Sequence, residues 1–115
     1  KFKSMSKLDE KIALYQTEMK KLGLSFDADL LTKVTKGLGP SIYKADAETV
    51  SGSDQKELAT VKNNFLIKKL GLADGPKLDK AIDTVIEKVG KSNRNKYRAI
   101  VYYLLVKELG QESKY

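Results

Sequence analysis

The sequence of 115 residues contains no cysteine and no histidine. This absence excludes disulfide bonds, thiolate nucleophiles, the usual zinc sites, and every catalytic pair of histidine with serine or cysteine. Serine, tyrosine, lysine and carboxylate groups are the reacting groups that remain. Since they form no complete catalytic motif, the sequence predicts a protein that is not an enzyme and that uses neither a cofactor nor a metal ion.

Long hydrophobic runs are also lacking. The longest, AIVYYLLV at residues 99–106, is less than half of the roughly 20 residues that cross a bilayer. No signal-peptide pattern is visible at the start of the sequence, so we expect a cytoplasmic protein without membrane contact. The first four residues, KFKS, precede Met5 and are interpreted as a tag or extension, and residues 5–115 as a single helical domain.

Strand-like alternation of apolar and polar residues is absent, and apolar residues recur at helical spacing along nearly the whole chain. The pattern predicts an all-α fold, a compact bundle of about five helices with an irregular connection between the second and the third. The last helix is apolar on all sides from Ala99 to Val106, which places it at the centre of the bundle. Buried there, Tyr102 and Tyr103 would need partners for their hydroxyl groups. The expected helices cover about residues 7–22, 27–36, 54–70, 76–89 and 92–109.

The pentapeptide KKLGL occurs twice, at residues 20–24 and 68–72. Lysines in a last helical turn oppose the negative end of the helix, glycine adopts the left-handed conformation after it, and the following leucine packs back. The repeat therefore indicates two helix ends rather than a duplicated domain.

Positive charge is concentrated near the C-terminus of a chain whose net charge is +7. Residues 88–98 carry five positive charges and no acid, and they include both arginines of the protein, Arg94 and Arg98. The start of a helix carries partial positive charge, so cations at this end of the last helix need a negative partner. The four-residue spacing would place the two guanidinium groups on one helix face.

That negative partner could come from outside the chain or from within it. Free N–H groups and guanidinium groups both suit an external anion, which makes the following residues candidates for anion binding: Lys91, Ser92, Arg94, Lys96 and Arg98. Alternatively, an acidic segment with Asp46, Glu48 and Asp54 supplies carboxylates, and the arginines hold the irregular connection against the bundle.

Two known motifs are matched only in part. The tripeptide GKS at residues 90–92 ends like a phosphate-binding loop, but Val85 stands where that motif has its first glycine, and a helix precedes it instead of a strand. The helices around GLADG could form a helix-turn-helix, yet Asp79, Asp83 and Glu87 form an acidic stripe that would repel a phosphate backbone. Three carboxylates on successive turns of one helix cannot surround a metal ion, so we expect this stripe to face solvent.

Three long segments, KGLGPSIYKADAETVS, VKNNFLIKKLGLADGPKLDKAI and GKSNRNKYRAIVYYLLVKELG, resemble a family of small bacterial proteins catalogued as domain of unknown function 2853. The resemblance covers almost the whole chain from Met5. It implies a bacterial, uncharacterised protein of one domain, and it supplies no activity and no catalytic residues.

The residues favour a non-catalytic binding module for an anionic partner, either nucleic acid or a ligand that carries phosphate. The alternative is a protein-interaction or oligomeric scaffold, such as a homodimer, in which the arginines form structural ion pairs.

Overall fold

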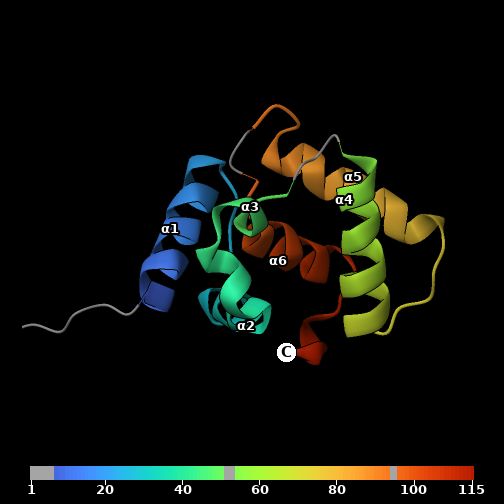
Figure 1. The fold of residues 1–115 in the computed structure, drawn as a ribbon, viewed down its shortest axis with the longest axis horizontal. Coiled ribbons are helices and arrows are strands. Elements are labelled where there is room, and N and C mark those ends of the chain that lie inside the picture. Colours follow the sequence, from blue (N-terminus) through green and yellow to red (C-terminus); the bar gives the residue numbers. More distant parts are fainter. Residues whose placement is uncertain (1–6, 51–53, 94–95) are drawn as a thin grey trace, which may run out of the picture.

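The computed structural model describes residues 7–50, 54–93 and 96–115, without the side chains of residues 41, 45 and 46. Its helices are α1 (Lys7–Lys21), α2 (Ala28–Leu38), α3 (Ala45–Glu48), α4 (Gln55–Thr60), α5 (Pro76–Val89) and α6 (Arg98–Glu108). A π-helical segment, η2 (Val61–Lys69), continues α4, and two 3-10 turns are η1 (Gly39–Tyr43) and η3 (Glu112–Lys114). The predicted all-α fold is confirmed, and Figure 1 shows the arrangement.

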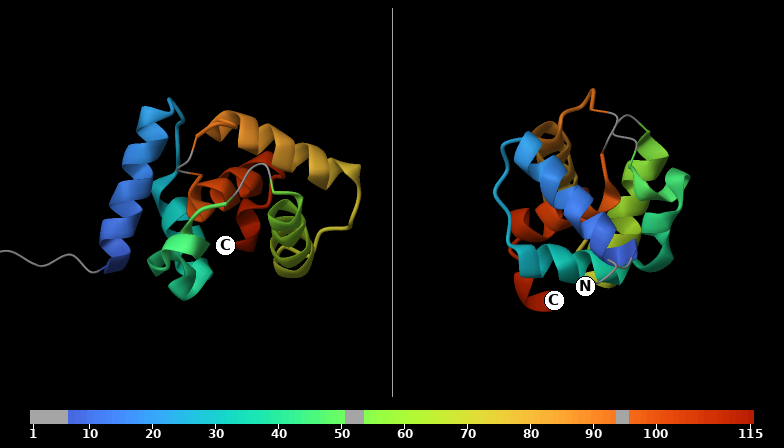
Figure 2. Two further views of the ribbon diagram at one scale, coloured as in Figure 1. Left: turned by 45° about the horizontal axis from the view of Figure 1, so that its top comes forward. Right: turned by 90° about the vertical axis from the view of Figure 1, so that its left-hand side faces the viewer.

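Helix α6 is the centre of the molecule, as the sequence predicts. Every residue from Ala99 to Val106 is buried, because α2 and α5 pack along α6 and α1 and α3 contact it as well. Figures 1 and 2 show α6 enclosed between α1 to α3 on one side and α4, η2 and α5 on the other. The two buried tyrosine hydroxyls have partners: Tyr102 accepts a hydrogen bond from Arg98 at 3.0 Å, and Tyr103 accepts one from the backbone N–H of Asp27 at 2.6 Å.

The helix ends follow the expected stop signals. Gly23 and Gly71, the glycines of the two KKLGL segments, have φ of 74° and 72°, a conformation that glycine adopts without steric cost. The backbone N–H groups of Leu24 and Leu72 then return to carbonyl groups of Met19 and Leu66. The repeated pentapeptide is a helix end in both places.

Segment η2 differs from the regular α-helix expected at residues 54–70. The helix begins as predicted, with the Asp54 carboxylate accepting hydrogen bonds from the N–H groups of Lys56 and Glu57. From Val61 onward it widens, and at its end the N–H of Leu70 bonds to the carbonyl of Phe65, five residues earlier. The buried residues Val61, Phe65 and Leu70 are four and five positions apart. That spacing fits a wider turn better than the roughly 3.6 residues per turn of an α-helix.

Helix α6 begins later than predicted, at Arg98 instead of residues 92–95. Tyr97 is extended and forms an antiparallel bridge with Thr49, and the carbonyl of Lys96 accepts a hydrogen bond from Val50 at 2.7 Å. The segment before α6 therefore pairs with the chain after α3. The expectation that Arg94 and Arg98 share one face of the last helix stays a prediction, since Arg94 lies outside the described residues.

Helix α1 is anchored by a buried phenol. Tyr15 is fully buried, its hydroxyl donates to the Glu48 carboxylate at 2.7 Å, and its ring contacts Tyr97 at 5.1 Å between centroids. Lys11 forms an ion pair with the same carboxylate at 2.9 Å. Burial first, and then the hydrogen bond to Glu48, raise the pKa of Tyr15 well above its ordinary value.

This raised pKa predicts a loss of stability in alkaline solution. Above pH 10.0, the ordinary pKa of tyrosine, the unfolded chain releases the Tyr15 proton while the folded protein keeps it. The free energy of unfolding should therefore fall by up to about 1.4 kcal/mol per pH unit through this residue. Urea unfolding between pH 9 and pH 11 should show a shallower decline for Tyr15→Phe than for the wild type. The exposed Tyr43→Phe is the matched control, and equal slopes for all three proteins would contradict the prediction.

Candidate anion-binding cleft

Arg98 joins three parts of the chain at the start of α6. Its Nε donates to the carbonyl of Ala47 in α3 at 2.8 Å, its Nη1 donates to the Tyr102 hydroxyl, and its Nη2 forms an ion pair with Glu57 in α4. The guanidinium carbon also lies 5.6 Å from the centroid of the Tyr102 ring. These contacts hold the connection after α3 and the start of α4 against the central helix.

The acid that meets Arg98 is not one of those considered in the sequence. Glu57 lies at the third position of α4, and its carboxylate turns to Arg98. Of the expected acids, Glu48 bonds to Lys11 and Tyr15, Asp54 caps α4, and the Asp46 side chain lies outside the described part of the structure. Burial alone would lower the pKa of Arg98, but Tyr102 and Glu57 outweigh it and raise the pKa of the guanidinium.

Lys96, a second predicted site residue, is directed inward. Only 5% of the residue is exposed, and its ammonium group donates to the carbonyl of Lys91 at 2.6 Å and to the carbonyl of Asn93. Burial lowers the pKa of Lys96, because removing the ammonium from water disfavours its charged form. Through these two hydrogen bonds, the ammonium group holds the loop between α5 and α6 together.

The other members of the predicted patch have different positions. Lys91 and Ser92 are exposed in the loop after α5. Arg94 lies outside the described residues, so the structure does not place it. Lys88 pairs with Glu108 across α5 and α6 at 3.4 Å. The structure therefore does not bring Lys91, Lys96 and Arg98 together on one surface.

Arg98 instead lines a cleft of about 420 Å³. The residues that line the cleft come from α2, α3, α4, η2 and α6 and from the chain after α6. Its described lining residues include two cationic side chains and no acidic side chain, and the others are largely apolar and aromatic. The described lining residues are Gly37, Leu38, Ala47, Thr60, Asn64, Phe65, Lys69, Arg98, Tyr102 and Tyr115.

The rings in this cleft are held by contacts with each other and with the cations. Phe65 and Tyr102 are stacked, with 4.0 Å between centroids and 19° between planes. Lys69 lies over the ring of Tyr115, with 5.7 Å from its Nζ to the centroid. Burial and the proximity of Tyr102 raise the pKa of Tyr115. Both cations of the cleft thus sit beside a tyrosine ring.

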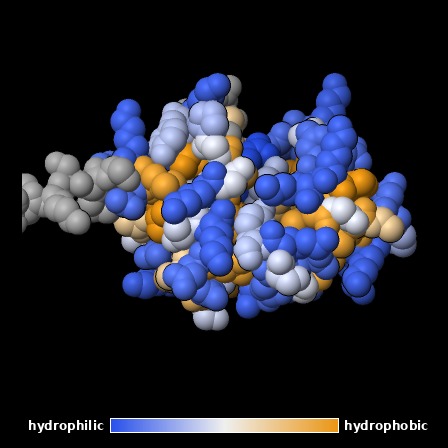
Figure 3. Space-filling model, turned by 90° about the horizontal axis from the view of Figure 1, so that it is seen from below, coloured by the Kyte–Doolittle hydropathy of each residue, from blue (hydrophilic) through white to orange (hydrophobic). Residues whose placement is uncertain are grey.

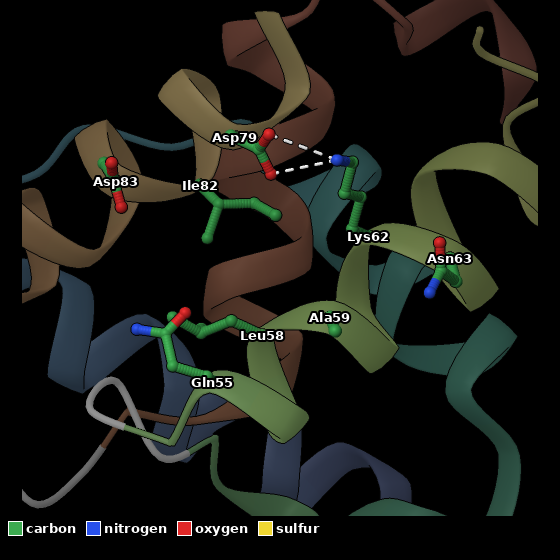
Figure 4. Close-up of a pocket in the computed structure, with 8 residues that line it drawn as sticks. All are labelled: Gln55, Leu58, Ala59, Lys62, Asn63, Asp79, Ile82 and Asp83. Carbon is green, nitrogen blue, oxygen red and sulfur yellow. Dashed lines mark hydrogen bonds and ion pairs between the residues drawn. The ribbon is translucent and has the colours of Figure 1, made fainter. Parts of the chain in front are cut away.

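A second pocket, of about 410 Å³, lies between α4 with η2 and α5 (Figure 4). Lys62 reaches across it and pairs with Asp74 at 2.8 Å and with Asp79 at 3.1 Å. These two carboxylates raise the pKa of Lys62, and Lys62 in turn lowers the pKa of Asp74. Because its ammonium group already has two carboxylate partners, and Asp83 adds a further acid to the lining, this pocket suits an anion poorly.

Sequence reasoning missed most of the cleft. In the sequence, Lys69 is recognisable only as part of a KKLGL helix end, and Phe65 only as a member of the helix expected at residues 54–70. The cleft forms because η2, the end of α2 and Tyr115 come together around α6, and no local pattern encodes that meeting. The only local signals were Lys69, a cation next to a helix end, and Phe65, an aromatic residue four positions before Lys69.

A family model described as Protein of unknown function (DUF2853) matches residues 14–113. The chain belongs to this family. The match includes every described lining residue of the cleft except Tyr115, and it confirms the family resemblance of the sequence. A comparison with curated proteins finds no match.

The described part of this DUF2853 protein has neither a metal-ion cluster nor a membrane-spanning helix. Across residues 7–50, 54–93 and 96–115, no group of three or more acidic side chains is arranged to hold a metal ion. In the same ranges, no helix has the length and apolar character required to cross a bilayer.

Replacing Arg98 by glutamine should destabilise the protein in the absence of any ligand. The change removes the hydrogen bonds of a guanidinium group whose side chain is only 14% exposed, and it leaves Glu57 without its partner. We expect a loss of about 1.5–3 kcal/mol in the free energy of unfolding. Denaturant titration measures it, and Lys91→Gln, an exposed change in the adjacent loop, should stay within about 0.5 kcal/mol of wild type.

A double-mutant cycle separates the ion pair from the other contacts of Arg98. Glu57→Gln should cost less stability in the Arg98→Gln background than in the wild type, because the pair is already broken. Equal costs in both backgrounds would show that the pair contributes nothing.

Proposed function

We propose that this protein is a non-catalytic binding module for an anionic ligand, which it holds in the cleft beside Arg98. The observation that carries the proposal is the charge of the side chains: Lys69 and Arg98 line the cleft, and no acidic side chain is among its described lining residues. Apolar walls with a few convergent polar groups are typical of ligand sites in proteins. A cavity of about 420 Å³ is within the usual range for such sites.

Arg98 keeps donor capacity for a ligand despite its structural contacts. A guanidinium group has five N–H donors. The contacts of Arg98 with described residues use three of them, one on each nitrogen, and two remain. The Tyr102 hydroxyl accepts from Arg98, and no described residue accepts the proton of that hydroxyl. Lys69 adds an exposed ammonium group. These groups together can donate several hydrogen bonds to one anionic group.

A small ligand fits these positions better than a nucleic-acid strand. Extended polyanions are bound by rows of exposed cations that neutralise successive phosphates. In the predicted patch, Lys96 and Arg98 donate to internal acceptors, and Lys88 pairs with Glu108. The exposed cation that remains in that patch among the described residues is Lys91.

Phenyl phosphate tests the proposed function, with phenol as its neutral counterpart. We expect phenyl phosphate to bind more tightly than phenol, in an NMR titration at low salt, because Lys69 and Arg98 attract its charge. Lys69→Gln should weaken phenyl phosphate binding roughly two- to fivefold, the range of an exposed charge contact. Lys68→Gln removes the same charge one residue away, outside the cleft lining, and should bind as the wild type does. If phenol binds as tightly as phenyl phosphate, the proposed function is wrong.

A second candidate function is a protein-interaction scaffold. The ion pair of Arg98 with Glu57 favours it, because the arginine then has a structural role without a ligand. Its surface would include Leu14 of α1 and Tyr43, which are 38% and 45% exposed. On the face drawn in Figure 3, apolar residues form patches that hydrophilic side chains separate, so a large continuous apolar surface is not present on that face.

The scaffold function predicts self-association through α1. If it holds, light scattering after size exclusion will find a dimer, and Leu14→Glu will convert it to a monomer. Thr17→Glu, an equally charged change at another exposed position of α1, is the control. Under the first proposal we expect a monomer whose size does not change with either substitution.

The expected bacterial origin and cytoplasmic location stay predictions, as does a nucleic-acid partner for the 88–98 segment. We place the module in the cytoplasm because the sequence favours that location, and we assign it no cofactor.

A further inference from the structure

We propose that the ligand of the cleft is a small molecule in which an anionic group is attached directly to a flat aromatic ring. This inference rests on the proposed function and narrows it to one ligand class. It is argued from the positions of the rings, the positions of the cations and the size of the cavity.

Three aromatic rings line the cleft, and Tyr115 is the most exposed of them. Phe65 and Tyr102 lie stacked against each other in its wall, and Tyr115 contributes a third ring from the chain after α6. Phe65 and Tyr102, a residue of the central helix, are buried, whereas Tyr115 is half-buried and its side chain lies against Gly37 of α2. Aromatic rings prefer offset-stacked or edge-to-face contact with other flat rings. A planar ligand would gain such contacts here, and a saturated ligand of the same size would gain only apolar contact.

The positions of the two cations indicate where the anionic group of that ligand would bind. Lys69 lies over the Tyr115 ring at 5.7 Å, and Arg98 lies over the Tyr102 ring at 5.6 Å. Each positive group is therefore adjacent to a tyrosine ring of the lining. An anionic group attached close to the ring would reach a cation while the ring stays in contact with the tyrosines. A long spacer between ring and charge would separate the two.

The size of the cavity favours a compound of one or two rings. Its volume of about 420 Å³ is near the lower end of the range for small-molecule sites. Thr60 and Asn64, at the rim formed by α4 and η2, can bond to polar substituents of the ring. Only one unit of a polymeric ligand could enter a cavity of this size.

Phenyl phosphate and cyclohexyl phosphate test this ligand class, because they share the anionic group and nearly the same size and differ in planarity. We expect phenyl phosphate to bind roughly two- to tenfold more tightly, the factor that corresponds to aromatic pairing. Tyr115→Ala should remove most of that preference, and Tyr43→Ala, which removes an exposed ring elsewhere, should keep it. The comparison of the two ligands on the wild-type protein needs no variant and is independent of any effect on folding.

The outcomes distinguish the failure of this inference from the failure of the proposed function. Equal affinity for the two phosphates would overturn the aromatic ligand class and leave anion binding intact. Absence of binding to both would overturn the proposed function as well. A ten-residue oligothymidylate gives a further comparison. If it binds without competing with phenyl phosphate, nucleic acid is bound by another surface. If it binds and phenyl phosphate does not, the inference is overturned.

Discussion

The fold depends on a single guanidinium group at the start of the buried helix. A helix that is apolar on all sides has no polar face with which to fix its position, so its ends determine how neighbouring segments attach. Arg98 binds α3 through a carbonyl, α4 through Glu57 and its own helix through Tyr102. Lysine could not replace these contacts, since they need three donors in one plane. The only arginine that the structure describes is therefore at the position where planar recognition matters most.

The same group links the fold to the cleft. Because the internal partners of Arg98 fix its guanidinium, the side of it that lines the cavity is already oriented before a ligand arrives. Preorganisation of this kind reduces the ordering cost of binding. The stacked rings of Phe65 and Tyr102 and the contact of Lys69 with Tyr115 act in the same direction. The architecture of the candidate site thus follows from contacts that the folded protein needs in any case.

Periodicity and stop signals were sufficient to predict the helices and the central place of α6. They failed where partners distant in sequence decide the outcome. Residues 96 and 97 directly precede α6, but they pair with residues 49 and 50, and Tyr97 is extended instead of helical. Val61 and Leu70 are nine positions apart, which is two and a half turns of an α-helix, and yet both face the core because η2 is wider. The Glu57 partner of Arg98 and the cleft residues Lys69 and Tyr115 required the three-dimensional arrangement.

The buried ammonium of Lys96 has a consequence for the loop between α5 and α6. Backbone carbonyl groups that are withdrawn from water need hydrogen-bond donors. Here one side chain of the loop donates to the carbonyls of both Lys91 and Asn93. The loop that leads into the central helix therefore supplies its own cross-link, without a covalent bond and without a partner from another element.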